Sequence, residues 1–303
     1  MTFRVHILGC GSATPTLRHA PSAQLVEHDA CSYLIDCGEG THLQLRRSKV
    51  SFQHMQAVFI SHLHGDHCLG LIPLLSSLAL LGRTKILHLY APAEYEQLYR
   101  AEMACYCPQP GYDIVLHAMD TTAQKVIYED RRISVTTLPL QHRVPCCGFL
   151  FREKGQLPHI RRDMIDALRI PISQINNIKN GAGWTDADGH VYTHEQLTLP
   201  ARKPRAYAYC SDTAYMPTLH EAIAGVDLLY HEATYADDNS FNALRYHHST
   251  ARQAAQVARQ ANAARLIIGH YSSRYSDENI LLNEAKDIFP DTLLANEGLV
   301  IDV

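Results

Sequence analysis

The sequence predicts an α/β fold, and three observations support this. Short apolar runs typical of strands alternate with longer stretches that have the periodicity of amphipathic helices. The 303 residues are enough for one large domain with a full apolar core, or for two small ones. Several apolar runs also end directly on histidine or aspartate. In α/β sheets, functional sites lie at strand ends of this kind.

The expected elements follow from these runs. The segments with strand character are Val5–Leu8, Ser32–Ile35, Ala57–Ile60, Ile86–Tyr90, Ile133–Leu138, Cys147–Phe151, Ala206–Cys210, Val226–Tyr230, Leu266–Ile268 and Leu299–Ile301. The segments with helical character are Leu69–Leu81, Glu94–Ala104, Thr250–Ala261 and Asp277–Phe289. The third of these is rich in alanine, which is the best helix former.

One long segment interrupts the alternation of strands and helices. Glu153–Arg205 is rich in glycine and proline, which end regular elements, and it holds the chain's single tryptophan, Trp184. We therefore expect a single domain over residues 1–303 with residues 153–205 as an insertion, which we call the arm segment.

The composition is that of an ordinary globular protein, with 46% hydrophobic and 19% charged residues. No apolar run reaches the roughly 18 residues that a membrane helix needs, and the N-terminal apolar run is too short for a signal peptide. Nine cysteines without C-x-x-C spacing fit reduced thiols better than disulfides. We therefore expect a cytoplasmic protein with no membrane partner. A net charge of −4 lacks the basic excess typical of nucleic-acid binding.

Five expected strands run into side chains that bind metals. The residues that follow them are His62, His142, Asp212, His231-Glu232 and His270. Because strand ends meet at one edge of a sheet, residues that are distant in the chain can converge there. The chain also holds 19 histidines, an unusual number that favours a search for metal sites.

The densest cluster of such side chains is His62-Leu63-His64-Gly65-Asp66-His67. Neutral imidazole and carboxylate are the ligands of zinc and similar divalent ions. In this motif His62 and His64 can face one ion, while Asp66 and His67 turn toward a second. The alternative, a surface cluster of histidines, fits poorly because the motif directly follows an apolar strand.

These motifs resemble the metallo-β-lactamase superfamily, whose signature is H-x-H-x-D-H, and more narrowly the short form of the ribonuclease Z family. The resemblance covers nearly the whole chain. It is carried by Leu8–Pro15, Asp36–Thr41, Ser61–His67, His231–Thr234, His248–Thr250 and Gly269–Tyr275. The superfamily signature does not specify a substrate, whereas the last three segments are much more specific.

The resemblance implies an αββα four-layer sandwich and an endoribonuclease that removes the 3′ trailer of precursor tRNA. It also implies two zinc ions as cofactors, a precursor tRNA partner and a homodimer. The implied ligands are His62, His64, His142 and Asp212 for the first ion, and Asp66, His67, Asp212 and His270 for the second, with Asp212 bridging. Manganese or iron occupies similar sites, so the sequence leaves the native metal open.

The resemblance also implies the catalytic residues. Two ions about 3.5–4 Å apart lower the pKa of a shared water and so generate an attacking hydroxide. Asp66 would orient this hydroxide, and His248, oriented by Glu232, would protonate the departing 3′-oxygen to leave a tRNA 3′-hydroxyl. From the residues alone, Glu232 also fits a polar strand end, and His248 also fits a residue at the start of a helix.

Five cationic residues are expected to bind the substrate: Arg161, Arg162, Lys203, Arg205 and Arg274. In the family an arm grips the tRNA, but here Ile170–Gln174 stands where the family has a Gly-Pro tip. Residues 154–200 hold five basic and five acidic residues. Because RNA affinity depends on phosphate neutralisation, a neutral arm weakens the tRNA interpretation unless its arginines form a local basic face. The alternative is a solvated helix face.

Two other functions stay open from the sequence. The first is a metallohydrolase of a small phosphodiester or ester, which the neutral arm and altered tip favour slightly. The second is an RNA-binding protein without catalysis, against which the intact set of metal ligands argues. The sequence also leaves open how precursors with an encoded CCA end are handled.

Overall fold

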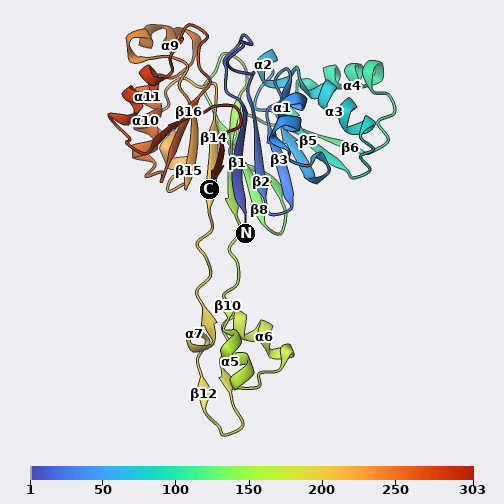
Figure 1. Cartoon of the computed structure of the whole chain (residues 1–303), viewed down its shortest axis with the longest axis vertical. Coiled ribbons are helices and arrows are strands. Elements are labelled where there is room, and N and C mark those ends of the chain that lie inside the picture. Colours follow the sequence, from blue (N-terminus) through green and yellow to red (C-terminus); the bar gives the residue numbers. More distant parts are fainter. Residues whose placement is uncertain (1) are drawn as a thin grey trace. The chain divides into compact units, whose positions relative to one another are not determined.

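Two seven-stranded sheets form the larger part of the chain (Figure 1). The computed structural model describes residues 2–303, and for Phe52 only its backbone. The chain divides into a larger unit, residues 2–129, 134–151 and 206–303, and a smaller unit, Asp130–Ile133 with Arg152–Arg205. Among the described residues, no helix has the length and apolar character needed to cross a membrane.

The first sheet has the strand order β18-β1-β2-β3-β4-β5-β6. Its strands are β1 (Phe3–Gly9), β2 (Ala23–His28), β3 (Cys31–Ile35), β4 (Met55–Phe59), β5 (Leu87–Pro92), β6 (Ile114–Met119) and β18 (Val300–Asp302). Strands β3 to β6 are parallel. The polar residues after β3 and β4 therefore meet at one edge of the sheet.

The second sheet has the order β17-β16-β15-β14-β9-β8-β7. Its strands are β7 (Val126–Glu129), β8 (Ile133–Pro139), β9 (Cys147–Glu153), β14 (Ala206–Cys210), β15 (Leu228–Glu232), β16 (Leu266–Gly269) and β17 (Thr292–Leu294). Strands β14 to β17 are parallel, so this sheet also gathers its carboxyl ends at one edge.

Helices cover the outer face of each sheet. On the first sheet lie α1 (Thr41–Ser48), α3 (Leu71–Leu80) and α4 (Tyr95–Tyr106), whose apolar sides share one buried core with β2 to β5. On the second lie α8 (Leu219–Ala222), α10 (Ala251–Gln260) and α11 (Asn279–Lys286). The single turn α2 (Gly65–Cys68) and the helix α9 (Ser240–Tyr246) belong to the loops at the sheet edges. This arrangement is the expected αββα sandwich.

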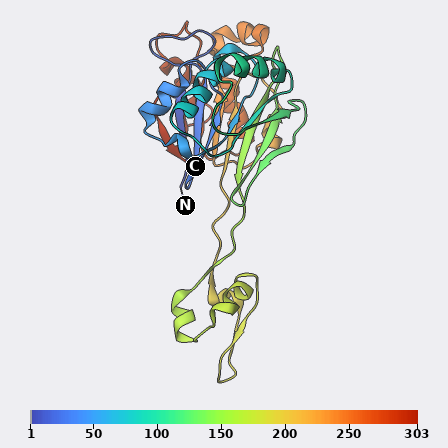
Figure 2. The ribbon, with the colours of Figure 1, turned by 90° about the vertical axis from the view of Figure 1, so that its right-hand side faces the viewer.

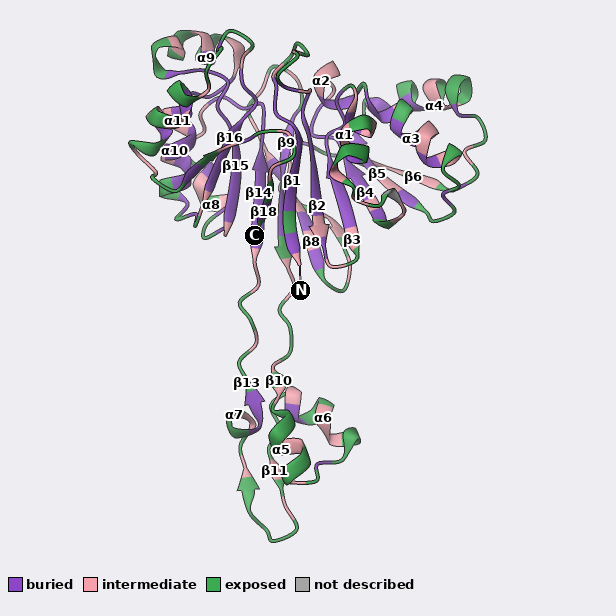
Figure 3. Ribbon diagram, in the orientation of Figure 1, coloured by how far each residue is buried: buried purple, intermediate pink, exposed green. Residues whose placement is uncertain are grey.

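The sheets pack face to face through large buried side chains. The ring of Phe59 on β4 lies 5.5 Å from that of Phe149 and 5.6 Å from that of Phe151, both on β9. Nearly all central strand residues are buried (Figure 3). Two hydrogen bonds also cross between the sheets, from the Tyr207 hydroxyl to Gln24 and from the Tyr209 hydroxyl to Asp36. The core is therefore tied by specific polar contacts as well as by apolar packing.

The expected elements all appear, with shifted ends, but several were not foreseen. The strand expected at Val226–Tyr230 is β15 at Leu228–Glu232, so His231 and Glu232 lie within the strand rather than after it. The strand β2 and the helix α1 were missed. Strand β2 is buried on both faces and so lacks the alternation of a half-buried strand, and the first turn of α1 has no acidic residue and its N-cap makes no side-chain hydrogen bond.

The smaller unit has its own short elements (Figure 2). They are β10 (His159–Ile160), α5 (Arg162–Ala167), α6 (Ile172–Lys179), β11 (Trp184–Thr185), β12 (Val191–Tyr192), α7 (His194–Leu197) and β13 (Thr198–Leu199). Strand β10 pairs with β13, and β11 pairs with β12. Ile170, Ile178 and Leu197 are buried together and form a small apolar core.

A close backbone contact fixes the loop that holds the histidine motif. The Gly70 amide donates to the Cys37 carbonyl, and the Cys37 amide donates to the His67 carbonyl, each at 2.8 Å. A Cβ at Gly70 would lie 2.0 Å from the Gly38 carbonyl oxygen, and one at Gly38 would lie 2.4 Å from the Asp66 carbonyl oxygen. Only glycine permits this approach of the two turns.

Gly70→Ala is expected to lower the free energy of unfolding by about 1–3 kcal/mol, because the added methyl group overlaps a backbone oxygen and forces the two turns apart. Gly70 has an ordinary φ of −82°, so the loss would report the steric clash rather than backbone strain. Urea denaturation followed by circular dichroism measures it. Gly155→Ala is the matched control, since its nearest neighbour would be 4.0 Å away. Equal stability of the two variants would contradict the prediction.

Candidate metal centre and active site

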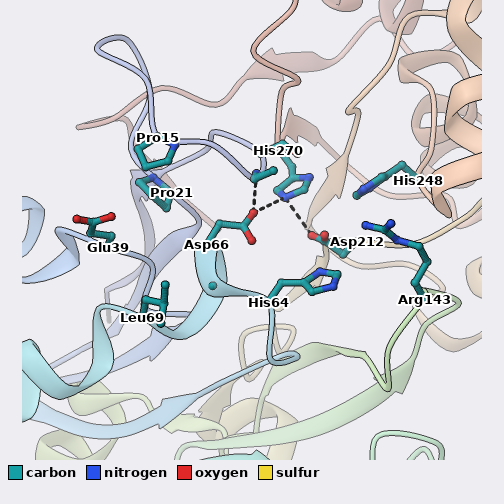
Figure 4. A pocket seen from close by; sticks show the side chains of 13 residues that line it. Pro15, Pro21, Glu39, His64, Asp66, Leu69, Arg143, Asp212, His248 and His270 are labelled. Carbon is teal, nitrogen blue, oxygen red and sulfur yellow. Dashed lines mark hydrogen bonds and ion pairs between the residues drawn. The ribbon is translucent and has the colours of Figure 1, made fainter.

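The ends of four strands bring the predicted metal ligands together. His62, His64, Asp66 and His67 follow β4, His142 lies between β8 and β9, Asp212 follows β14, and His270 follows β16. Four of them, His64, Asp66, Asp212 and His270, line a pocket of about 340 Å³ at the edges of the two sheets (Figure 4). His62, His67, Asp212 and His270 are almost fully buried.

The first group consists of His62, His64, His142 and Asp212, whose donor atoms all lie within 4.8 Å of one another. His62 Nε2 is 3.0 Å from His64 Nδ1, and His142 Nε2 is 3.3 Å from the same atom. Asp212 Oδ2 lies 3.7 Å from both His62 Nε2 and His142 Nε2. Three imidazole nitrogens and one carboxylate oxygen thus converge on one point.

The second group consists of Asp66, His67 and His270, and the other oxygen of Asp212 joins it. His67 Nε2 and His270 Nε2 are 3.3 Å apart, and each is 3.5 Å from Asp66 Oδ2. Asp212 Oδ1 is 3.1 Å from His67 Nε2 and 3.2 Å from His270 Nε2. The Asp212 carboxylate therefore presents one oxygen to each group.

The imidazole rings are oriented by their other nitrogens. His67 Nδ1 donates to Asp36 at 2.7 Å, and His142 Nδ1 donates to the His247 carbonyl at 3.0 Å. His270 Nδ1 is 3.0 Å from the Thr234 hydroxyl, which gives its own proton to Glu232. In a neutral ring with a protonated Nδ1, Nε2 carries a lone pair.

These lone pairs point at one another, which suits a bound cation. Two imidazoles on a tetrahedral zinc, with Zn–N near 2.0–2.1 Å, are separated by about 3.3 Å. The nitrogen pairs in both groups are 3.0 to 3.3 Å apart. The donor set, five imidazoles and two carboxylates, therefore fits two divalent ions such as zinc, manganese or iron.

The pKa values differ between the two groups because their charges differ. Burial lowers the pKa of His142 to about 4 and moves that of His62 well below its usual value, which keeps both rings neutral. Burial also acts to lower the pKa of His67, but Asp212, Asp66 and Asp36 outweigh it and raise that pKa well above the usual range. The second group is the more strongly anionic of the two.

Asp36 is a positioning residue that the sequence did not single out. It is fully buried and accepts hydrogen bonds from the Ser61 amide and hydroxyl, the Tyr209 hydroxyl and His67 Nδ1, all within 2.9 Å. It thereby fixes the end of β4 and the tautomer of His67. Its place directly after the apolar strand β3 is the same signal that predicted the metal ligands.

His248 and Glu232 form a buried pair beside the predicted metal ligands. His248 Nδ1 lies 2.7 Å from Glu232 Oε1. Glu232 also accepts from the Thr213 amide and from the amide and hydroxyl of Thr234. Burial lowers the pKa of His248, but the Glu232 carboxylate outweighs it, so that pKa rises to about 9. With Nδ1 committed to Glu232, Nε2 is the nitrogen available to a substrate.

The predicted substrate-binding residues are more scattered. Arg161, Arg162 and Lys203 are exposed and belong to the smaller unit. Arg205 also belongs to it, but its guanidinium is held by both carboxylate oxygens of Glu153 at 2.7 and 3.0 Å. Arg205 therefore has a structural partner, and its binding of substrate stays a prediction. Arg274 lies over the ring of Tyr235 and donates to Asn239.

Two further contributors to the pocket were missed. The Ala13 amide donates to Asp66 Oδ2 at 2.7 Å, so a loop after β1 helps to orient that carboxylate. Arg143 lines the pocket next to His248. In the sequence, Arg143 directly follows His142. The sequence alone does not show where the side chain of an arginine in a loop points, because that depends on the fold.

Comparison with known families matches two parts of the chain. Residues 3–153 match the model of the anti-Pycsar protein Apyc1, and residues 185–271 match the β-lactamase superfamily domain.

Solved structures show the same fold. The human tRNase Z, short form, superimposes with a TM-score of 0.72 over 98% of both chains at 24% identity. The metallo-β-lactamase fold protein YhfI from Bacillus subtilis superimposes with a TM-score of 0.69 over 100% of both chains at 19% identity. At these identities the likeness establishes the metallo-β-lactamase fold.

The relationship by sequence is closer and covers the full chain. A ribonuclease Z of Bacteroides thetaiotaomicron is 49% identical over 301 residues, which are 99% of this chain and 95% of that protein. Identity at this level extends across both whole chains, beyond the metal loop and the other short motifs. This chain therefore belongs to the ribonuclease Z family, and it is an endonuclease that acts on the phosphodiester bonds of RNA.

Proposed function

We propose that this protein removes the 3′ trailer of precursor tRNA by hydrolysis that depends on two divalent metal ions. The observation that carries the proposal is the position of Asp212, whose two carboxylate oxygens face two separate groups of imidazoles. Full-length similarity to ribonuclease Z supports RNA as the substrate. Cleavage on the 3′ side of the last retained nucleotide would leave a 3′-hydroxyl on the tRNA.

Seven residues would hold the metal ions. His62, His64, His142 and Asp212 would bind the first, and Asp66, His67, His270 and Asp212 the second. We propose zinc, which favours imidazole and carboxylate ligands, with manganese or iron as alternatives. When bound, such a pair of ions stabilises negative charge on the phosphoryl group and lowers the pKa of the attacking water.

Asp66 would position the attacking water. The Ala13 amide fixes Asp66 Oδ2, and the same oxygen lies 3.5 Å from His67 and His270. Burial acts against ionisation of Asp66, but His67 and His270 outweigh it and lower the Asp66 pKa. The ionised carboxylate can accept a hydrogen bond from water in the pocket and orient it toward phosphorus.

His248 would protonate the leaving 3′-oxygen. Glu232 holds Nδ1 and leaves Nε2 on the pocket side, where His248 is one of the lining residues. An alkoxide is a poor leaving group, so a proton delivered as the bond breaks lowers the barrier. Three donors besides His248 fix Glu232 and thereby the direction of the His248 ring.

The arm segment (153–205) would bind the tRNA away from the cleavage site. Arg161 and Arg162 are exposed at the start of α5, and Lys203 is exposed nearer the end of the segment. Overall neutrality of the segment does not prevent a local basic face, since phosphate contacts depend on individual cations. We extend the proposal to a homodimer and to a cytoplasmic location, where precursor tRNA and nine unpaired thiols are both expected.

A small phosphodiester or ester is the less favoured substrate. The full-length relatives are ribonucleases, and the pocket is open to solvent rather than closed around a small molecule.

Incubation with a precursor tRNA carrying a 3′ trailer is expected to give cleavage directly after the discriminator base, because the pocket holds the groups for hydrolysis of a phosphodiester. Chelation should abolish the cleavage and zinc or manganese should restore it. Mapping of the product ends should show a 3′-hydroxyl on the tRNA. A protein that hydrolyses bis(p-nitrophenyl) phosphate but leaves the precursor intact would contradict the tRNA assignment and favour the small phosphodiester.

His248→Ala is expected to lower the turnover number for precursor tRNA by roughly 10²- to 10⁴-fold, the usual contribution of a general acid. Metal content, measured by atomic emission, should stay at the wild-type value. Hydrolysis of bis(p-nitrophenyl) phosphate is the internal control, because p-nitrophenolate leaves without a proton and should be much less affected. Loss of metal, or an equal loss on both substrates, would exclude the assignment of His248 as the acid.

Arg161→Ala combined with Arg162→Ala is expected to raise KM for precursor tRNA, because two cations that neutralise phosphates are removed. The slope of log affinity against log salt should fall by about 2, one for each phosphate that is no longer neutralised. Hydrolysis of bis(p-nitrophenyl) phosphate should not change. The matched control is Arg100→Ala combined with Arg259→Ala, which removes two exposed cations from the larger unit. The same salt slope in both double variants would exclude the arm arginines from RNA binding.

A further inference from the structure

Arg143 is the single lysine or arginine among the described residues that line the active-site pocket. It follows the ligand His142 in the loop between β8 and β9, and its side chain is exposed. Its guanidinium lies 5.8 Å from the ring centre of Tyr246, the last residue of α9, which braces it. Figure 4 shows the guanidinium extending toward His248 and Asp212.

No ion pair or hydrogen bond engages this guanidinium within the chain over residues 2–303. The other arginines near the site have partners: Arg18 pairs with Glu278 at 2.7 Å, and Arg274 donates to Asn239 at 3.0 Å. Arg143 acts electrostatically on the site all the same, since its charge contributes to lowering the pKa of both His64 and His248. An unpaired guanidinium beside a phosphodiesterase centre is suited to bind phosphate, which it matches with two parallel hydrogen bonds.

The position of Arg143 indicates which phosphate it would bind. The pocket has two ends, with Arg143 and His248 at one and Glu39, Pro15 and Leu69 at the other (Figure 4). His248 is placed to protonate the leaving 3′-oxygen, which belongs to the last nucleotide retained on the tRNA. The backbone of that nucleotide must therefore leave the centre on the Arg143 side, whereas the trailer leaves toward Glu39.

We propose that Arg143 binds the phosphodiester on the 5′ side of the last retained nucleotide, one linkage before the bond that is cleaved. This inference rests on the proposed function. It adds a substrate contact that positions the bond to be cleaved relative to the active site. The scissile phosphate itself would lie beside the predicted ligands, where bound ions would supply its charge stabilisation. A cation at the edge of the pocket then binds the neighbouring phosphate. It therefore favours a polynucleotide over a substrate with one phosphate.

Steady-state kinetics of Arg143→Ala and Arg143→Lys test the proposal on two substrates. Arg143→Ala is expected to lower kcat/KM for precursor tRNA by roughly 10- to 100-fold, the range for loss of a charge-assisted hydrogen bond. Arg143→Lys should recover part of it, because the charge remains but the bidentate geometry is lost. Hydrolysis of bis(p-nitrophenyl) phosphate, which has no neighbouring phosphate, should stay within about twofold of the wild type for both variants.

A modified substrate identifies the contact. In a precursor tRNA with a neutral methylphosphonate one linkage 5′ of the cleavage site, wild type and Arg143→Ala should cleave at the same, reduced rate. Arg245→Ala is the matched control, because Arg245 lies 5.4 Å from the same Tyr246 ring but does not line the pocket. This variant should behave as the wild type on all three substrates.

Three results would overturn the inference. An equal loss on bis(p-nitrophenyl) phosphate would place Arg143 at the scissile phosphate. A loss by Arg143→Ala that persists on the methylphosphonate substrate would place its contact elsewhere, and unchanged cleavage of precursor tRNA would exclude any contact. Failure of the proposed function is distinguishable from all of these, because the wild type itself would then leave precursor tRNA intact while hydrolysing bis(p-nitrophenyl) phosphate.

Discussion

The buried carboxylate of Asp212 is the point on which the site depends. Its two oxygens face two groups of imidazoles that come from both sheets, so it sets the separation of the two groups. Burial alone would favour a neutral carboxyl, but His270 and His67 keep its pKa well below the usual value. A carboxylate at this depth is costly unless cations compensate it. The fold thus places a negative charge where bound divalent metal would supply the compensation.

The imidazoles are held by a network that also ties the sheets together. Asp36 lies at the end of β3 in the first sheet, and it accepts from His67 and from Tyr209 of β14 in the second. Glu232 at the end of β15 reaches His248 directly and His270 through the Thr234 hydroxyl. The same hydrogen bonds therefore stabilise the sandwich and fix the ring nitrogens, so the geometry of the site and the packing of the sheets are not independent.

The distribution of cations explains how a chain of net charge −4 can act on RNA. Positive charge at the centre comes from the ions that the ligands would hold, which the formal count omits. At the rim it comes from Arg143, which no partner in the described chain neutralises. In the smaller unit, Arg161 and Arg162 are exposed while Arg205 is used to hold Glu153. Local placement of charge, rather than its total, therefore decides whether such a chain can bind phosphates.

The sequence by itself determined the alternation of strands and helices, the predicted metal loop His62–His67 and the polar residues at strand ends, because periodicity and spacing are local properties. It did not identify the roles of Asp36, Ala13 or Arg143. Each role depends on a contact that forms only when the chain folds. Asp36 accepts a hydrogen bond from Tyr209 of the other sheet, the loop of Ala13 folds over Asp66, and Arg143 lines the pocket. The strand β15 was predicted to end before His231, but it continues to Glu232. A strand that is buried on both faces can carry polar residues where tertiary partners satisfy them, as His248 does for Glu232. The sequence thus sufficed to predict which residues are ligands, whereas the tertiary structure decides the direction of each side chain and its partners.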